Sequence, residues 1–119
     1  LLNLGHTVGH AIEKLKGFSM LHGQCVAVGL VAAAKLSMDR GLLTKEETEK
    51  IKKACLSYDL PIGVDGLLAE EILAATKKDK KMFQGHIRFI LMDGIGRSFM
   101  DDTVTDEELL SCIQETIYQ

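Results

Sequence analysis

The sequence predicts a mainly α-helical fold of about five helices with one short β-hairpin. Apolar residues recur at three- and four-residue intervals through most of the chain, and two Thr-x-x-Glu motifs have the spacing of helix-starting capping boxes. Only residues 86–100 have the β-branched and aromatic composition typical of paired strands. A chain of 119 residues is the size of one domain with its own core.

The first two predicted helices contain most of the residues of interest. The first runs from Asn3 to Lys16, where apolar residues share one helical face: Leu4, Val8, Ile12 and Leu15. The second runs from about His22 to Arg40 and is apolar almost all the way round, which predicts a central buried helix. Gly17 and Gly41 are expected to end these helices.

Three further helices and the hairpin follow from local patterns. Thr44 and Glu47 predict the start of an amphipathic helix, whose apolar face should hold Ile51, Ala54 and Cys55. The connector around Pro61 leads to a fourth helix that ends near the lysines at 77–81, and Thr105 and Glu108 predict the start of a fifth. The dipeptide at 93–94, Asp-Gly, favours the turn of the hairpin.

Composition excludes several classes of partner. The net charge is -3 and the sequence pI is about 5.8, so the chain has no broad basic surface for nucleic acid or anionic lipid. The longest apolar run, residues 25–38, is broken by Lys35 and is short for a membrane span. Three widely spaced cysteines without a C-x-x-C pair indicate a reducing, cytoplasmic setting. The chain starts on leucine, so we expect the natural N-terminus to lie upstream.

Three histidines are candidate metal ligands or proton carriers. His6 and His10 are four residues apart and share one helical face, and His22 stands at the start of the next helix after a short loop. Imidazole is a common zinc ligand, and catalytic zinc usually has three protein ligands and one open position. The H-x-x-x-H spacing alone is more often found on a polar helix face or in a hydrogen-bonded core pair than in a metal site, so both interpretations stay open.

Glycines beside the histidines predict a close approach to the backbone. Gly5, Gly9 and Gly23 flank the three histidines. Glycine within a helix costs roughly 1 kcal/mol relative to alanine, so its presence indicates that another helix or a ligand comes near.

A cationic cluster and several isolated residues are further candidates for anion or substrate binding. The cluster holds Lys77, Lys78, Lys80 and Lys81. Such lysines are typical of a solvated helix C-terminus, although one of them could reach a phosphate or carboxylate. Asn3 could cap its helix or bind a substrate hydroxyl, and Glu13 shares that helix. His86, Arg88 and Arg97 border the predicted hairpin, and His86 is expected at the surface.

Four motifs in order resemble the 3-dehydroquinate synthase family. They are "LLNLGHTVGHAIE", "LHGQCVAVGL", "KKDKK" and "RFILMDGIGRS", and together they extend over nearly the whole chain. The resemblance is to the C-terminal, mostly helical domain of a two-domain enzyme. It implies that residues 1–119 are a metal- and substrate-binding domain, without the N-terminal NAD-binding domain.

The resemblance implies separate roles for the candidate residues. His6 and His22 match the two histidines that hold zinc together with a glutamate upstream of this chain. His10 matches the histidine that lies by the substrate phosphate and takes part in proton transfer. Asn3 matches a substrate-contacting asparagine, and Lys80, or its neighbour Lys81, matches a substrate-binding lysine. Gln24 stands where the family usually has glutamate and is expected to tune the site.

The reaction that the resemblance implies belongs to the shikimate pathway. It converts 3-deoxy-D-arabino-heptulosonate 7-phosphate, a small phosphorylated sugar acid, to 3-dehydroquinate and phosphate, with zinc (or cobalt) and NAD as cofactors. The full-length enzyme is expected to be a cytoplasmic homodimer, and the isolated chain is expected to be inactive. Three alternatives remain: a related sugar-phosphate cyclase, a metal-dependent glycerol or alcohol dehydrogenase of the same architecture, and a non-catalytic helical module.

Overall fold

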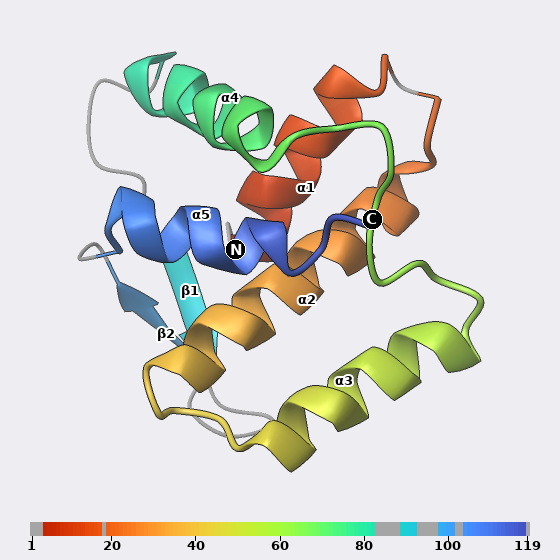
Figure 1. Ribbon diagram of the computed structural model, residues 1–119, viewed down its shortest axis with the longest axis vertical. Helices are drawn as coiled ribbons and strands as arrows, with labels where there is room; N and C mark the ends of the chain where they lie inside the picture. The colour runs from red at the N-terminus through yellow and green to blue at the C-terminus, as the bar shows by residue number, and fades with distance from the viewer. Residues whose placement is uncertain (1–3, 18, 83–88, 93–97, 102–103, 119) are drawn as a thin grey trace.

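Helix α2 (His22–Asp39) runs through the middle of the computed structural model, and the other elements surround it (Figure 1). The structure describes residues 4–17, 19–82, 89–92, 98–101 and 104–118, with side chains described over 7–17, 19–77 and 104–118. In this part of the chain there are four further helices and two strands: α1 (Leu4–Leu15), α3 (Lys45–Ser57), α4 (Ala69–Met82), β1 (Phe89–Met92), β2 (Ser98–Asp101) and α5 (Asp106–Gln114). The mainly helical prediction is therefore confirmed.

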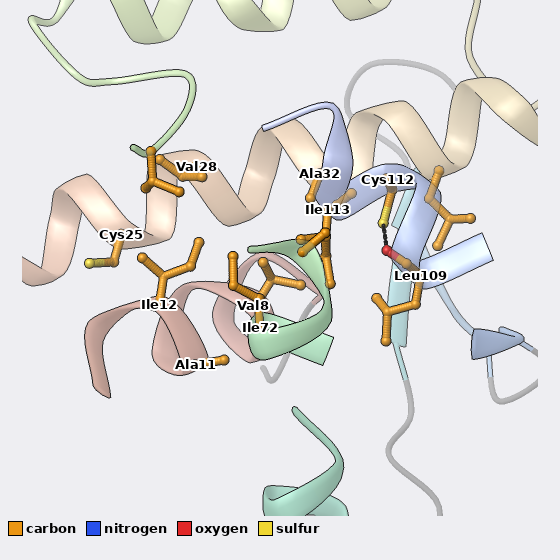
Figure 2. Close-up of a cluster of buried hydrophobic side chains, with 14 residues drawn as sticks. Val8, Ala11, Ile12, Cys25, Val28, Ala32, Ile72, Leu109, Cys112 and Ile113 are labelled. Atoms are coloured by element: carbon orange, nitrogen blue, oxygen red, sulfur yellow. Dashed lines mark hydrogen bonds between the residues drawn. The ribbon is translucent and has the colours of Figure 1, made fainter. Parts of the chain in front are cut away.

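The core lies between α1, α2, α4 and α5. Figure 2 shows α1 side chains facing α2, with side chains from α4 and α5 close to them. The largest cluster of buried apolar residues in the described chain includes Val8, Ala11, Ile12, Cys25, Val28, Ala32, Ile72, Leu109, Cys112 and Ile113. Helix α3 packs separately against the opposite face of α2, where Ala27, Val31 and Cys55 form a smaller cluster. Helix α2 is thus buried on two sides, as its all-round apolar sequence predicts.

Helix ends follow the predicted local chemistry. Gly17 (φ 60°) and Gly41 (φ 77°) lie just after α1 and α2 and adopt left-handed backbone conformations. Residues with a side chain rarely adopt such conformations, so glycine suits both positions. At the start of α3, Thr44 Oγ1 accepts from the Glu47 amide at 3.0 Å, and the Glu47 carboxylate accepts from the Thr44 amide at 3.0 Å. The same reciprocal pair joins Thr105 and Glu108 at the start of α5, so both capping boxes are confirmed.

The buried face of α3 differs from the prediction at one residue. Cys55 is buried and Ile51 is half-buried, but Ala54 is exposed. Position 54 lies one residue from Cys55 and is therefore rotated away from the stripe that faces α2. Thr48 occupies that stripe instead; its hydroxyl donates to the Thr44 carbonyl at 3.0 Å, which makes its burial tolerable.

Strands β1 and β2 pair antiparallel, from Phe89 opposite Asp101 to Met92 opposite Ser98. The predicted turn at 93–94 lies outside the described residues. In the described part of the chain, no helix combines the length and apolar character needed to cross a lipid bilayer.

Helix α1 packs closely against α2 at Gly9. A Cβ at this position would lie 2.7 Å from the Cys25 carbonyl oxygen and 3.1 Å from the Val26 Cα. The predicted close approach is therefore confirmed for Gly9, and the approaching group is another helix. At Gly23 the prediction is wrong, because a Cβ there would meet nothing within 4 Å. The surroundings of Gly5 lie outside the described side chains.

An ion pair joins the end of α2 to the start of α5. The Arg40 guanidinium donates from Nε to Glu108 Oε2 at 2.6 Å and from Nη2 to Oε1 at 2.8 Å. This two-point pairing is the geometry that arginine and carboxylate favour. Hydrogen bonding from Arg40 is the largest cause that lowers the pKa of Glu108 to about 2.

Replacing Gly9 with alanine should destabilise the fold, because the new methyl group would meet backbone atoms of α2. We expect a loss of about 1–3 kcal/mol in the free energy of unfolding, the usual cost of overpacking. Gly23→Ala is the matched control and should change it by less than about 0.5 kcal/mol or raise it slightly. Urea unfolding followed by circular dichroism measures both variants, and equal stability of Gly9→Ala and the parent would contradict the close contact.

The Arg40–Glu108 pair should stabilise the protein at neutral pH and lose this effect in acid. The folded pKa of about 2 is below the ordinary 4.5, so the unfolded chain takes up the proton first. The contribution is therefore complete above about pH 5 and declines toward pH 2. Glu108→Gln should lower the free energy of unfolding by about 1 kcal/mol at pH 7 and by much less at pH 3. The effect at pH 7 is modest because both side chains of the pair are partly exposed.

The control for this measurement is Glu107→Gln, because Glu107 is exposed in the same first turn of α5. Its unfolding free energy should match the parent at both pH values. A deficit in Glu108→Gln that stays unchanged between pH 7 and pH 3 would contradict the assignment of the lowered pKa to this pair.

Candidate active site

Helix α1 and the first residue of α2 bring two histidines and one glutamate together. His10 and Glu13 are three residues apart on α1 and so share a face. A short connection leads from α1 to α2, where the Gly17 amide donates to the Lys14 carbonyl and the Ser19 amide donates to the Lys16 carbonyl. His22 then opens α2 beside Glu13. The structure thus places His22 against the first helix.

Both imidazole rings face the same carboxylate through Nδ1. The Nδ1 atom of His22 lies 3.4 Å from Glu13 Oε1 and 3.3 Å from Oε2. The Nδ1 atom of His10 lies 3.6 Å from Oε1. The side chain of Glu13 is only 12% exposed, against 38% for His10 and 60% for His22. The carboxylate therefore lies beneath two more exposed rings.

Sequence reasoning placed Glu13 on the histidine helix but gave it no role. The i,i+3 spacing from His10 was the available signal, because it puts the two side chains on one face. The proximity of His22 had no local signal, since it depends on how α2 packs against α1.

The other predicted site residues are placed only in part. His6 lies on α1, and Lys80 and Lys81 lie in the last turn of α4, but their side chains are not among those described. Asn3, His86, Arg88 and Arg97 lie outside the described residues. Over the described ranges, no group of three or more histidine, cysteine, aspartate or glutamate side chains is arranged to hold a metal ion.

The lysine cluster begins with a residue that has a structural partner. Lys77, half-exposed on α4, forms an ion pair with Asp106 at the first position of α5. This contact links α4 to α5, and it assigns Lys77 a role in packing these helices.

The three cysteines are free and buried, so they pack rather than react. Cys25 lies on α2, and burial is the largest cause of its raised pKa, followed by the charge of Glu13. Burial also raises the pKa of Cys55 and raises that of Cys112 to about 12. Raised thiol pKa values leave little thiolate at neutral pH, so none of the three thiols is suited to nucleophilic catalysis.

Gln24 has a defined structural role beside the site. Its Oε1 accepts from the Leu21 amide at 3.0 Å and so satisfies a backbone donor at the start of α2. A glutamate carboxylate could accept the same bond, so glutamine keeps this contact while removing one negative charge close to His22.

A groove of about 550 Å³ lies next to this region but does not contain the histidines. Residues that line it include Lys16 just after α1, Pro61 and its neighbours in the connector, and Tyr118 near the C-terminus. Lys16 crosses one wall, where its Nζ donates to the Asp65 carbonyl at 2.6 Å and lies 3.2 Å from the Asp65 carboxylate. The groove and the His10–Glu13–His22 cluster are separate features.

Comparison with known sequences finds one matching family model and relatives that are named 3-dehydroquinate synthase. Residues 1–82 match the family model described as 3-dehydroquinate synthase C-terminal. The 3-dehydroquinate synthase of Colwellia psychrerythraea is 43% identical over 92% of this chain. That of Pseudoalteromonas translucida is 41% identical over 97%, and that of Synechococcus is 38% identical over 96%. The chain spans about a third of the length of these relatives, between 31% and 33%.

Comparison with solved structures shows the same fold in two synthases. The 2-epi-5-epi-valiolone synthase of Streptomyces hygroscopicus, solved with NAD+ and Zn2+ bound, superposes with a TM-score of 0.85 at 24% identity over 95% of this chain and 31% of its own. A 2-deoxy-scyllo-inosose synthase, solved with carbaglucose-6-phosphate, NAD+ and Co2+, gives a TM-score of 0.76 at 24% identity over 95% of this chain and 32% of its own. At this identity the likeness concerns the fold alone.

Proposed function

Because the chain belongs to the 3-dehydroquinate synthase C-terminal family, we propose that residues 1–119 are the metal- and substrate-binding domain of a 3-dehydroquinate synthase. The complete enzyme would convert 3-deoxy-D-arabino-heptulosonate 7-phosphate to 3-dehydroquinate and phosphate in the shikimate pathway. The observation that carries this proposal is the identity of 38–43% to enzymes of that name over nearly the whole chain.

His6 and His22 would hold the metal, together with a carboxylate from outside this chain. The donor chemistry fits, since two neutral imidazoles and one carboxylate form a usual catalytic zinc set with an open fourth position. The described member of the pair, His22, supports this role: its ring is 60% exposed and its Nδ1 is occupied by a carboxylate. When bound, zinc or cobalt would act as a Lewis acid toward the substrate oxygens.

The residues of this chain would bind the substrate and move protons. His10, 38% exposed beside Glu13, would carry a proton to or from the substrate near its phosphate, a task suited to imidazole at neutral pH. Asn3 would hydrogen-bond a substrate hydroxyl, and Lys80 or Lys81 would pair with an anionic group as a point charge. Hydride transfer belongs to NAD, which a preceding nucleotide-binding domain would hold.

The proposal extends to the setting of the complete enzyme. A reducing compartment fits three free, buried cysteines, so we place the enzyme in the cytoplasm. We also propose a homodimer as its assembly. The 119 residues alone should lack synthase activity, because one metal ligand and the nucleotide-binding domain lie elsewhere.

Substitution of the histidines in the complete enzyme should separate metal binding from proton transfer. His22→Ala should lose stoichiometric zinc, as measured by metal analysis after gel filtration, and synthase activity with it. His10→Gln should keep its zinc and lose about 10²–10⁴-fold in turnover, the usual contribution of a general acid or base. Each variant is the control for the other.

Two results would count against the proposal. One is full zinc content and activity in His22→Ala. The other is a substrate panel in which the complete enzyme ignores the heptulosonate phosphate and turns over another sugar phosphate, such as glucose 6-phosphate, which would place it among the related cyclases. Phosphate release by the isolated chain would contradict the need for a second domain.

A further inference from the structure

We propose that Glu13 is a positioning residue that holds His22 through its Nδ1 atom and lies beside the ring of His10. In this arrangement Nε2 of His22 is directed to the metal. The inference rests on the proposed function, and it adds a residue to which the family match gives no role.

The first support is the direction in which the rings are held. An ionised carboxylate can only accept hydrogen bonds, so the ring nitrogen of His22 that bonds to it must carry the proton. Nδ1 of His10 faces the same carboxylate at 3.6 Å, which is too far for a hydrogen bond. Both Oε atoms of Glu13 lie within 3.4 Å of Nδ1 of His22, so this N–H is shared between them. With the proton fixed on Nδ1, the lone pair of the neutral ring is on Nε2, at the far side from Glu13.

The second support is burial. A carboxylate that is 12% exposed is costly unless charged or hydrogen-bonding groups compensate it, and the two imidazoles are groups that do so here. The rings are three to five times more exposed than the carboxylate, so Glu13 lies behind them relative to solvent. A ligand that approached from solvent would meet the rings before the carboxylate.

The third support is the rigidity of the elements that carry the three residues. His10 and Glu13 are fixed relative to each other by one helical turn, and the Gly9 contact fixes α1 against the start of α2. Carboxylates that accept from the second nitrogen of a metal-binding histidine commonly raise metal affinity by 10–100-fold. Glu13 has the geometry for this role at His22, and its carboxylate also lies 3.6 Å from Nδ1 of His10.

The test uses the complete, metal-free enzyme and compares Glu13→Gln and Glu13→Ala with Glu49→Gln, an exposed glutamate on α3. Dissociation constants for Co2+ and Zn2+ are measured by chelator competition. Glu13→Ala should bind about 10–100-fold more weakly. Glu13→Gln should bind several-fold more weakly, because a neutral amide oxygen accepts less strongly than a carboxylate. Glu49→Gln should match the parent.

A second readout reports the tautomers directly. Long-range 15N–1H spectra of the histidine-labelled, metal-free enzyme should show the Nδ1–H form for His22 in the parent and in Glu13→Gln. In Glu13→Ala the ring of His22 should shift toward the Nε2–H form. A purely structural role for Glu13 would lower stability without changing the tautomers of a folded variant.

The outcomes separate this inference from the proposed function. If His22→Ala loses the metal while both Glu13 variants keep the parent affinity and tautomers, the positioning role is wrong and the proposed function stands. Complete loss of binding in a folded Glu13→Ala, equal to that of His22→Ala, would make Glu13 a ligand and overturn the inference. If Glu13→Ala does not fold, the affinity of Glu13→Gln decides. A parent enzyme that binds neither metal would overturn both proposals.

Discussion

Gly9 allows α1 to pack so closely against α2 that no space is left for a side chain. A Cβ at this position would lie 2.7 Å from the Cys25 carbonyl oxygen and 3.1 Å from the Val26 Cα. Any side chain at this position would force the helices apart, and the buried contacts of Val8 and Ile12 with Cys25 and Val28 would open with them. Because His22 begins α2 and Glu13 lies on α1, the same contact sets the distance between the His22 ring and the Glu13 carboxylate. Core packing and site geometry therefore depend on one helix pair.

The remaining helices pack around α1 and α2. Helices α4 and α5 cover the core side, with Ile72 and Ile113 in the same buried cluster, and Arg40 ties the far end of α2 to Glu108 of α5. Helix α3 closes the other face of α2. This arrangement leaves the start of α2 and the middle of α1 with exposed rings over a carboxylate that is only 12% exposed. A rigid support beneath exposed imidazoles suits a site that must present ring nitrogens in fixed directions.

Local chemistry in the sequence predicted most of the fold. The capping boxes at Thr44 and Thr105 fixed two helix starts, and Gly41 fixed the end of α2, because each depends on residues within one turn. Features that depend on tertiary contacts are harder to predict from the sequence. The exposure of Ala54 reflects how α3 is rotated on α2, and the open surroundings of Gly23 contrast with the crowded Gly9 although both flank histidines. The role of Glu13 was missed because its second partner, His22, comes from another helix.

In the proposed site, α1 and α2 present Nε2 of His22 to a metal. Glu13 accepts from Nδ1 of the same ring, and His10 contacts the substrate and not the metal. A crystal structure of the complete enzyme with zinc, with the metal located by anomalous scattering at the zinc edge, tests this most directly. We predict a zinc position about 2.0–2.1 Å from Nε2 of His22 and of His6, with Glu13 still on Nδ1 of His22 and His10 off the metal. Zinc bound to Nδ1 of His22, to Glu13 or to His10 would contradict the account.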